Sequence, residues 1–135
     1  MRIEACTTDA AIDDAIAILQ QLWTDTDTSF IREFIDEEEY HLFGLYDDNL
    51  RAVAGCSIQR VLHHRTHAWI HDLVVDQAHR SAGYGSELLS FVTDWARSNE
   101  CAVVALAATL ENDSAGEFYI ENGMQRWGYV FEQEC

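Results

Sequence analysis

The sequence predicts a single-domain α/β (α+β) fold over residues 1–135, with a mixed central sheet of about six strands flanked by about four helices. Three observations lead to this prediction. The length of 135 residues suits one domain, and a hydrophobic content of 48% supplies a core. Segments with helical and strand periodicity then follow in an order that ends in a strand–helix–strand unit, which implies a mixed sheet with helices on its faces.

The N-terminal part is expected to form a strand and two helices. The segment "RIEACT" (2–7) fits a first strand, and apolar residues recur at helical spacing over roughly 9–23. The polar run "TDTDTS" then offers N-cap side chains for a second helix in "FIREFIDEEEY" (30–40).

Three strands are expected next. "YHLFGLYD" (40–47) and "RAVAGCSIQRVL" (51–62) are β-prone runs joined by turn-forming residues, which is typical of a hairpin. "THAWIHDLVV" (66–75) is a third long strand. The three together predict a meander.

The C-terminal part alternates between helix and strand. An amphipathic helix is expected from about residue 84 to residue 96, and the unbroken apolar run "CAVVALAAT" (101–109) fits a strand buried on both faces. A short helix over about 113–122 and a final strand, "MQRWGYVFEQ" (124–133), complete the predicted fold.

The charge is strongly acidic, with 24 Asp and Glu against 8 basic residues, all of them Arg, and a formal net charge of -16. Such acidity could attract a cationic substrate, or it could keep the protein solvated in a salty cytoplasm. The acidic residues are dispersed along the chain, which favours salt adaptation. Nucleic-acid binding is not expected, because it requires clustered basic residues.

Neither a membrane protein nor a zinc-binding protein is expected. No stretch approaches the roughly 20 apolar residues that cross a bilayer, and "MRIEACTTDA" lacks the apolar segment of a signal peptide, so a cytoplasmic protein is expected. Cys6, Cys56, Cys101 and Cys135 are widely spaced without a CxxC pair. They indicate apolar fillers or free thiols rather than a zinc site or a disulfide framework.

The stretch "RSAGYG" (80–85) lies between a predicted strand and a predicted helix. Glycines there let the backbone approach an anion, and the N–H groups of a helix start attract one. A Walker A loop is excluded because the chain has no Lys, and the dinucleotide fingerprint lacks its third glycine. A plain glycine-bearing turn is the structural alternative.

Together with its flanks, this stretch resembles the central motif of the GNAT family of N-acetyltransferases. "HDLVVDQAHRSAGYGSELL" (71–89) is similar to the family's strand, [QR]-x-x-G-x-[GA] loop and helix. "LENDSAGEFYIENGM" (110–124) is similar to its downstream motif, an Asn followed by a helix with F-Y-x-x-x-G. The resemblance covers most of 41–131, and residues 1–40 match only in element type. It implies the acyl-CoA N-acyltransferase (GNAT) fold, with acetyl-CoA as the acyl donor.

The resemblance also implies which residues hold acetyl-CoA. The end of one strand would lie along the pantetheine arm, and the loop amides would hold the diphosphate. The Asn of the second motif would hydrogen-bond the cofactor, and its Phe and Tyr would line the sulfur end. Apart from the resemblance, the arginine before the glycines could add a positive charge nearby. Strands 67–75 and 101–107 would splay apart to admit the cofactor. The residues are Leu73, Val74 and Val75, then Arg80, Ser81, Ala82, Gly83, Tyr84, Gly85 and Ser86, and finally Asn112, Phe118 and Tyr119.

Two side chains are candidates for proton transfer. Tyr119, a phenol that is protonated at neutral pH, matches the position at which the family commonly protonates the leaving thiolate. His71 is the candidate base; strand alternation places it on the opposite face from Asp72. Each has a structural alternative: Tyr119 could only pack beside the cofactor, and His71 could be a half-buried side chain satisfied by the backbone. Asp72 and Glu111 are weaker candidates for the base.

These residues predict an acetyl-CoA-dependent N-acetyltransferase that acts by direct transfer in a ternary complex, without a metal. A small-molecule amine is the favoured acceptor. The connection that carries His63, His64 and His67 and the helical segment 24–39 are expected to border its pocket. Protein N-terminal or lysine acetylation, and a non-catalytic acyl-CoA-binding module, remain alternatives, as does a homodimer. His63, His64 and His67 could suggest a metal-binding protein, but without a Cys or carboxylate at ligand spacing they favour a surface loop.

Overall fold

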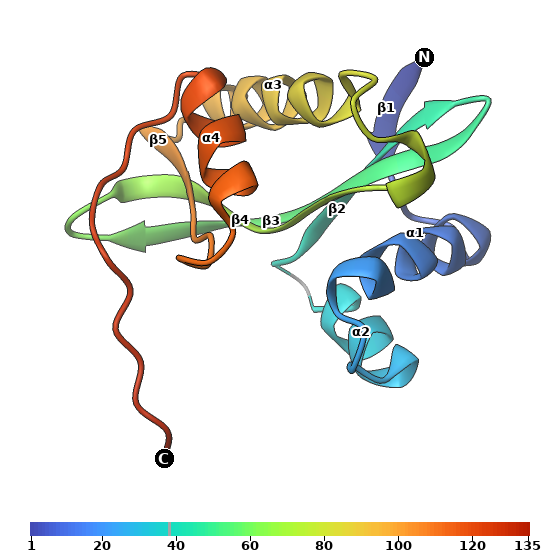
Figure 1. Ribbon diagram of the computed structural model, residues 1–135, viewed down its shortest axis with the longest axis horizontal. Coiled ribbons are helices and arrows are strands. Elements are labelled where there is room, and N and C mark those ends of the chain that lie inside the picture. The colour runs from blue at the N-terminus through green and yellow to red at the C-terminus, as the bar shows by residue number, and fades with distance from the viewer. Residues whose placement is uncertain (38) are drawn as a thin grey trace. The chain divides into compact units, whose positions relative to one another are not determined.

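A five-stranded sheet organises the computed structural model, which describes residues 1–37 and 39–135 (Figure 1). The strands lie in the order β1-β2-β3-β4-β5, and each of the first three pairs with the next in antiparallel register. The N–H of Ala102 donates to the carbonyl of Thr66 at 2.7 Å, so the start of β5 lies beside the start of β4. Because β5 is also the neighbour of β4 in the sheet, both strands lead away from this point in the same direction. The predicted meander and mixed sheet are confirmed. The strands are β1 (Arg2–Ala5), β2 (His41–Asp47), β3 (Asn49–Val61), β4 (Arg65–Val75) and β5 (Val103–Leu106).

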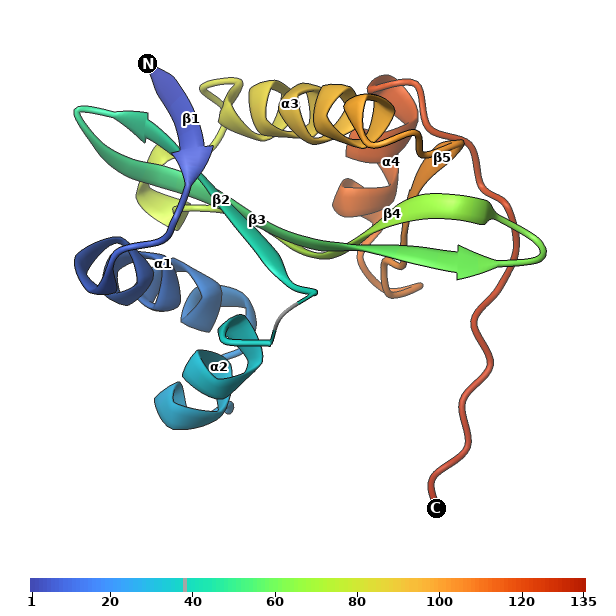
Figure 2. The same cartoon turned by 180° about the vertical axis from the view of Figure 1, so that it is seen from behind.

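Helices cover both faces of this sheet. Helices α1 (Asp9–Leu22) and α2 (Thr28–Ile35) lie on one face, and α3 (Tyr84–Ser98) lies on the other, as Figures 1 and 2 show from opposite sides. The apolar stripe of α1 packs with Val53 and Val74 of the sheet in one buried core. The apolar stripe of α3 is equally buried, with Leu88 and Val92 fully inaccessible to solvent. The predicted class, helices flanking a mixed sheet, is confirmed.

The bounds of the second helix were predicted wrongly. It begins at Thr28 because the side chain of Asp27 caps it, accepting a hydrogen bond from the N–H of Ser29 at 3.4 Å. It ends at Ile35, ahead of the acidic run "DEEE", whose charges are unfavourable at the negative end of a helix dipole. Position 38 of the predicted helix lies outside the described residues.

The predicted final strand over 124–133 was also wrong. Residues 124–135, all of them described, follow α4 (Asp113–Glu121) as an extended tail without strand pairing, so the described sheet has five strands rather than about six. The apolar alternation that predicted a strand is present, but Tyr129 and Phe131 are 77% and 92% exposed. A strand requires a hydrogen-bonding partner, and alternation by itself does not supply one.

The chain divides into two units, residues 1–105 and residues 106–135. The first holds the core, β1 to β4 and the helices α1 to α3, and the second holds α4 and the tail. That residues 1–135 form a single domain stays a prediction. Across the two described stretches of the chain, no helix is both long enough and apolar enough to span a bilayer.

Candidate functional site

The loop between β4 and α3 leaves the start of a helix uncapped. After β4 the chain forms a short 3-10 turn (Gln77–His79) and an exposed stretch to Gly83, and α3 begins at Tyr84. Ser81 and Gly83 adopt left-handed backbone conformations, with φ of 67° and 85°. A side chain caps the N-terminus of α1, α2 and α4, whereas no side chain caps α3. The first N–H groups of α3 therefore face an open loop, which is the arrangement that binds anions.

Hydrogen bonds to neighbouring elements hold this loop in place. The hydroxyl of Tyr84 donates to the carboxylate of Asp47 at the end of β2, at 2.7 Å. The amide of Gln21 on α1 donates to Asp76 at 3.1 Å and accepts from the N–H of Gln77 at 2.9 Å. These bonds fix the loop conformation before any ligand arrives.

Arg80 lies where the sequence placed a positive charge. Its Nε donates to the carbonyl of Val75 at 3.4 Å, so the guanidinium is held near the end of β4. Of the other predicted residues in the loop, Ser81 and Ala82 are exposed, Ser86 is half-buried, and Gly85 is buried inside the first turn of α3.

Strand β4 carries a bulge at His71, the residue predicted to act as the general base. Asp72 is opposite Gly55 of β3 and Ile70 is opposite Cys56, so His71 is an extra residue without a partner across the strand pair. Burial alternates as predicted: Ile70, Asp72 and Val74 are buried, and His71, Leu73 and Val75 are half-buried. The bulge nevertheless turns His71 so that it and Asp72 both approach the same side chain, Tyr40.

His71 lies among polar and aromatic partners. Its Nε2 is 2.7 Å from the hydroxyl of Ser57, and its ring lies 5.7 Å and 5.9 Å from the rings of Phe34 and Tyr40. Burial lowers the pKa of His71 from its usual 6.5, although the nearby carboxylates of Asp72 and Glu37 act in the opposite direction. The imidazole is therefore neutral at pH 7, the form in which it can accept a proton.

Asp72 is a buried carboxylate, and each of its two oxygens accepts a hydrogen bond from a neutral donor. The indole N–H of Trp23 donates to Oδ1 at 2.6 Å, and the hydroxyl of Tyr40 donates to Oδ2 at 2.9 Å. Burial and the charge of Asp72 raise the pKa of Tyr40 well above its usual value, so Tyr40 remains a donor. Both carboxylate oxygens of Asp72 therefore serve as hydrogen-bond acceptors.

Sequence reasoning missed Trp23, Tyr40 and Ser57 as members of this site. The sequence contained one signal, which is the glycine at position 55 inside a long strand. In the structure, a Cβ added to Gly55 would lie 1.6 Å from the hydroxyl oxygen of Tyr40. The glycine at that position is therefore what allows Tyr40 to reach Asp72 across β3. A glycine inside a long strand can mark such a close approach.

The second motif forms the cap and one face of α4. The side-chain oxygen of Asn112 accepts from the N–H of Ala115 and from the hydroxyl of Ser114, both at 3.1 Å. The rings of Phe118 and Tyr119 lie edge to face with centroids 5.3 Å apart. Burial raises the pKa of Tyr119, so its hydroxyl is protonated at neutral pH.

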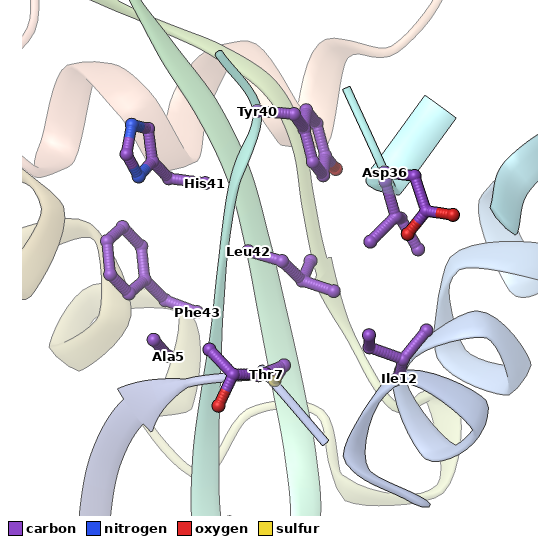
Figure 3. Close-up of a pocket in the computed structure, with 10 residues that line it drawn as sticks. Ala5, Thr7, Ile12, Asp36, Tyr40, His41, Leu42 and Phe43 are labelled. Carbon is purple, nitrogen blue, oxygen red and sulfur yellow. The ribbon is translucent and has the colours of Figure 1, made fainter. Parts of the chain in front are cut away.

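A pocket of about 260 Å³ opens elsewhere, beside the start of β2 (Figure 3). Figure 3 shows Tyr40 and Leu42 on one side of the β2 ribbon, and His41 and Phe43 on the other. None of the residues predicted for cofactor binding or catalysis lines it. The lining residues are Ala5, Cys6, Thr7, Ile12, Ile35, Asp36, Tyr40, His41, Leu42 and Phe43.

The histidines of the β3–β4 hairpin were placed only partly correctly. His63 lies in the exposed turn, as expected, and its ring centroid is 4.6 Å from that of His64. His67 instead lies within β4, only 1% exposed, with Nδ1 3.1 Å from the carbonyl of Arg65. Over residues 1–37 and 39–135, no three or more His, Cys, Asp or Glu side chains are grouped to hold a metal ion.

Comparisons with known proteins agree with the two motifs. The acetyltransferase (GNAT) family matches residues 8–124. An uncharacterized N-acetyltransferase, YhdJ of Bacillus subtilis (strain 168), is 32% identical over an alignment of 126 residues, and the match covers 89% of this chain and 89% of that protein.

Solved structures with the same fold include two aminoglycoside acetyltransferases. The 6'-N-acetyltransferase AAC(6')-IG from Acinetobacter haemolyticus has a TM-score of 0.85 and 22% identity, covering 100% of this chain and 98% of its own. The aminoglycoside N-acetyltransferase AAC(6')-Iy, solved in complex with CoA, has a TM-score of 0.84 and 14% identity, covering 99% and 95%.

The fold and the two motifs define the class of an N-acetyltransferase. More particularly, the chain belongs to the acetyltransferase (GNAT) family, as the sequence predicted.

Proposed function

We propose that this chain transfers the acetyl group of acetyl-CoA to a primary amine by direct attack in a ternary complex, and that the acceptor is a small molecule. The observation that carries this proposal is the uncapped N-terminus of α3 behind a glycine loop held by Asp47 and Gln21. Family membership supplies acetyl-CoA as the acyl donor, and a structural neighbour is a complex with CoA.

The residues present fit such a ligand. The N–H groups from Ser81 to Ser86 would donate to the diphosphate, and Arg80 would add a positive charge at the end of β4. The backbone of Leu73, Val74 and Val75 would hydrogen-bond the pantetheine arm as an added strand. The side-chain oxygen of Asn112 is used by the helix cap, so its NH₂ group would be the donor toward the cofactor.

The thioester of acetyl-CoA supplies an activated acetyl group. In the transfer, the amine nitrogen forms a bond to the carbonyl carbon as the carbon–sulfur bond breaks, and the products are an N-acetyl amine, the CoA thiol and one proton released to solvent. His71 would accept the proton that leaves the ammonium group, directly or through water, because its pKa lies below 6.5 and it is neutral at pH 7. Tyr119 would donate a proton to the departing thiolate, because its raised pKa keeps it protonated.

A screen of amine acceptors tests the proposal. The full chain in concentrated KCl should release CoA thiol from acetyl-CoA when a primary amine is present, and the Tyr119→Phe variant should release it far more slowly. Uptake of CoA without thiol release for any small amine, peptide N-terminus or lysine peptide would favour the non-catalytic module instead. Release only with peptides would move the acceptor to the protein class.

A further inference from the structure

Asp72 is a buried carboxylate that no cation among the described residues balances. It is 9% exposed, and its two oxygens accept hydrogen bonds from Trp23 and Tyr40, which are both neutral. None of the ion pairs among the described residues includes it. Buried carboxylates in proteins are normally paired with a cation, so a cationic ligand would complete this site.

The two donors of Asp72, Trp23 and Tyr40, are aromatic, and Tyr40 contacts a further ring on α2. The rings of Phe34 and Tyr40 lie edge to face at 4.9 Å, and Phe34 also contacts the ring of His71. Phe30 is one turn earlier on α2, on the same stripe as Phe34, and is 62% exposed, while Trp23 is 46% exposed. We refer to Trp23, Phe30, Phe34 and Tyr40 as the aromatic cluster.

The aromatic cluster and Asp72 adjoin the proposed base. Tyr40 donates its hydroxyl to Asp72 and places its ring 5.9 Å from the ring of His71. A cation drawn to Asp72 would therefore have its nitrogen near the imidazole that is proposed to deprotonate it. Aromatic faces attract cations and also bury apolar surface, whereas they offer few partners to the hydroxyl groups of a sugar.

We propose that the acetyl acceptor is a small organic cation with an apolar body, aryl or alkyl, whose ammonium group is recognised by Asp72 and whose body packs on the aromatic cluster. This inference rests on the proposed function, since it names the substrate class of the same site. The proposed acceptor class differs from the aminoglycosides that appear in the names of two structural neighbours.

The test compares three probes on the full chain in concentrated KCl. Phenethylamine carries both the charge and the apolar body, glucosamine carries the charge with hydroxyl groups, and 2-phenylethanol carries the body without the charge. Binding is measured by calorimetry, and transfer by release of CoA thiol. Phenethylamine should bind about 10-fold or more tightly than either of the other probes, because each lacks one of the two recognised features.

Variants separate recognition from folding. Asp72→Asn keeps the size of the side chain. It should weaken the binding of phenethylamine about 10-fold or more and leave the binding of 2-phenylethanol unchanged. Phe30→Ala, at an exposed position, should weaken both of those probes. Asp14→Asn, on the exposed face of α1, and Phe131→Ala, in the exposed tail, are the matched controls and should change neither. CoA binding should be retained in all four variants.

The outcomes distinguish this inference from the proposed function. Phenethylamine binding that depends on Asp72, without thiol release for any amine, would support the recognition site and overturn the transferase function. Thiol release that is faster with glucosamine than with phenethylamine would overturn the inference and leave the transferase function standing. If Asp72→Asn lost affinity equally for phenethylamine and for 2-phenylethanol, this carboxylate would have only a structural role, and the inference would fail.

Discussion

Nε2 of His71 lies 2.7 Å from the hydroxyl oxygen of Ser57, across the β3–β4 strand pair. The contact forms because the bulge on β4 leaves His71 without a partner residue on β3 and turns its ring toward Phe34 and Tyr40. The imidazole thus contacts a side-chain hydroxyl. The structural alternative to a catalytic role was a histidine satisfied by the backbone. Among the described residues the ring of His71 has no second hydrogen-bond partner, so its other ring nitrogen is able to serve chemistry.

Replacing His71 should slow the chemical step. We expect His71→Gln to lower kcat on the order of 10²-fold, since a general base contributes that much or more, with the KM for acetyl-CoA nearly unchanged. Steady-state thiol release measures both constants. An unchanged kcat would assign proton removal to water or to another residue.

The pH dependence should follow the lowered pKa of His71. Burial favours the neutral imidazole, so kcat/KM for acetyl-CoA should fall on the acid side with a midpoint below 6.5. The same shift affects stability: the unfolded chain binds the proton first, so the contribution of His71 to the free energy of unfolding is complete above pH 6.5 and is lost as the pH falls through the folded pKa. A pH–rate profile with its acid midpoint at or above 6.5 would contradict the assignment.

Removing the hydroxyl of Tyr119 should affect catalysis and not binding. Tyr119→Phe keeps the ring beside Phe118 but removes the proton donor, so kcat should drop on the order of 10²-fold while CoA affinity stays the same. Tyr129→Phe, at a tail position that is 77% exposed, is the matched control. Wild-type kcat in Tyr119→Phe would indicate that this ring only packs beside the cofactor.

The left-handed backbone at Gly83 should matter for both folding and the loop. Its φ of 85° strains any residue with a Cβ, although an added Cβ would meet nothing within 4 Å. We expect Gly83→Ala to lower the free energy of unfolding by about 1 kcal/mol and to weaken CoA binding. Gly128→Ala has equally open space and no positive φ, so it should change neither quantity in denaturation and calorimetry. Equal losses in the two variants would argue against a special role for Gly83.

Salt should strengthen the binding of acetyl-CoA. The protein carries a net charge of -16 and the ligand is an anion. At about 1 M salt the screening length is near 3 Å, so the overall repulsion nearly vanishes and the loop amides determine the affinity. The dissociation constant of CoA should therefore decrease as KCl rises, with circular dichroism as a control for the fold. Tightest binding in dilute buffer would contradict this expectation and the salt-adaptation reading of the charge.

Local patterns were sufficient to predict much of this fold, because caps and hydrophobic periodicity act over a few residues. The helix at 9–23 and the glycine loop before Tyr84 are where their patterns placed them. The final strand failed because apolar alternation in 124–133 does not reveal whether a partner strand exists.

The site was harder to predict than the fold. Trp23, Tyr40 and Asp72 are far apart in sequence, and a bulge opposite Gly55 brings Asp72 and His71 to one tyrosine. Strand alternation placed His71 and Asp72 on opposite faces, and a bulge is a non-local feature that alternation cannot anticipate. The glycine loop lies between a strand and a helix, as predicted, because the pattern that indicates it is contained in a single contiguous segment.

Whether the amides from Ser81 to Ser86 hold the diphosphate is tested by calorimetric titration of CoA into the full chain in concentrated KCl. We predict one CoA bound per chain, with affinity reduced by Gly83→Ala and unaffected by Gly128→Ala. An absence of binding heat at any temperature, or an affinity indifferent to Gly83, would contradict it.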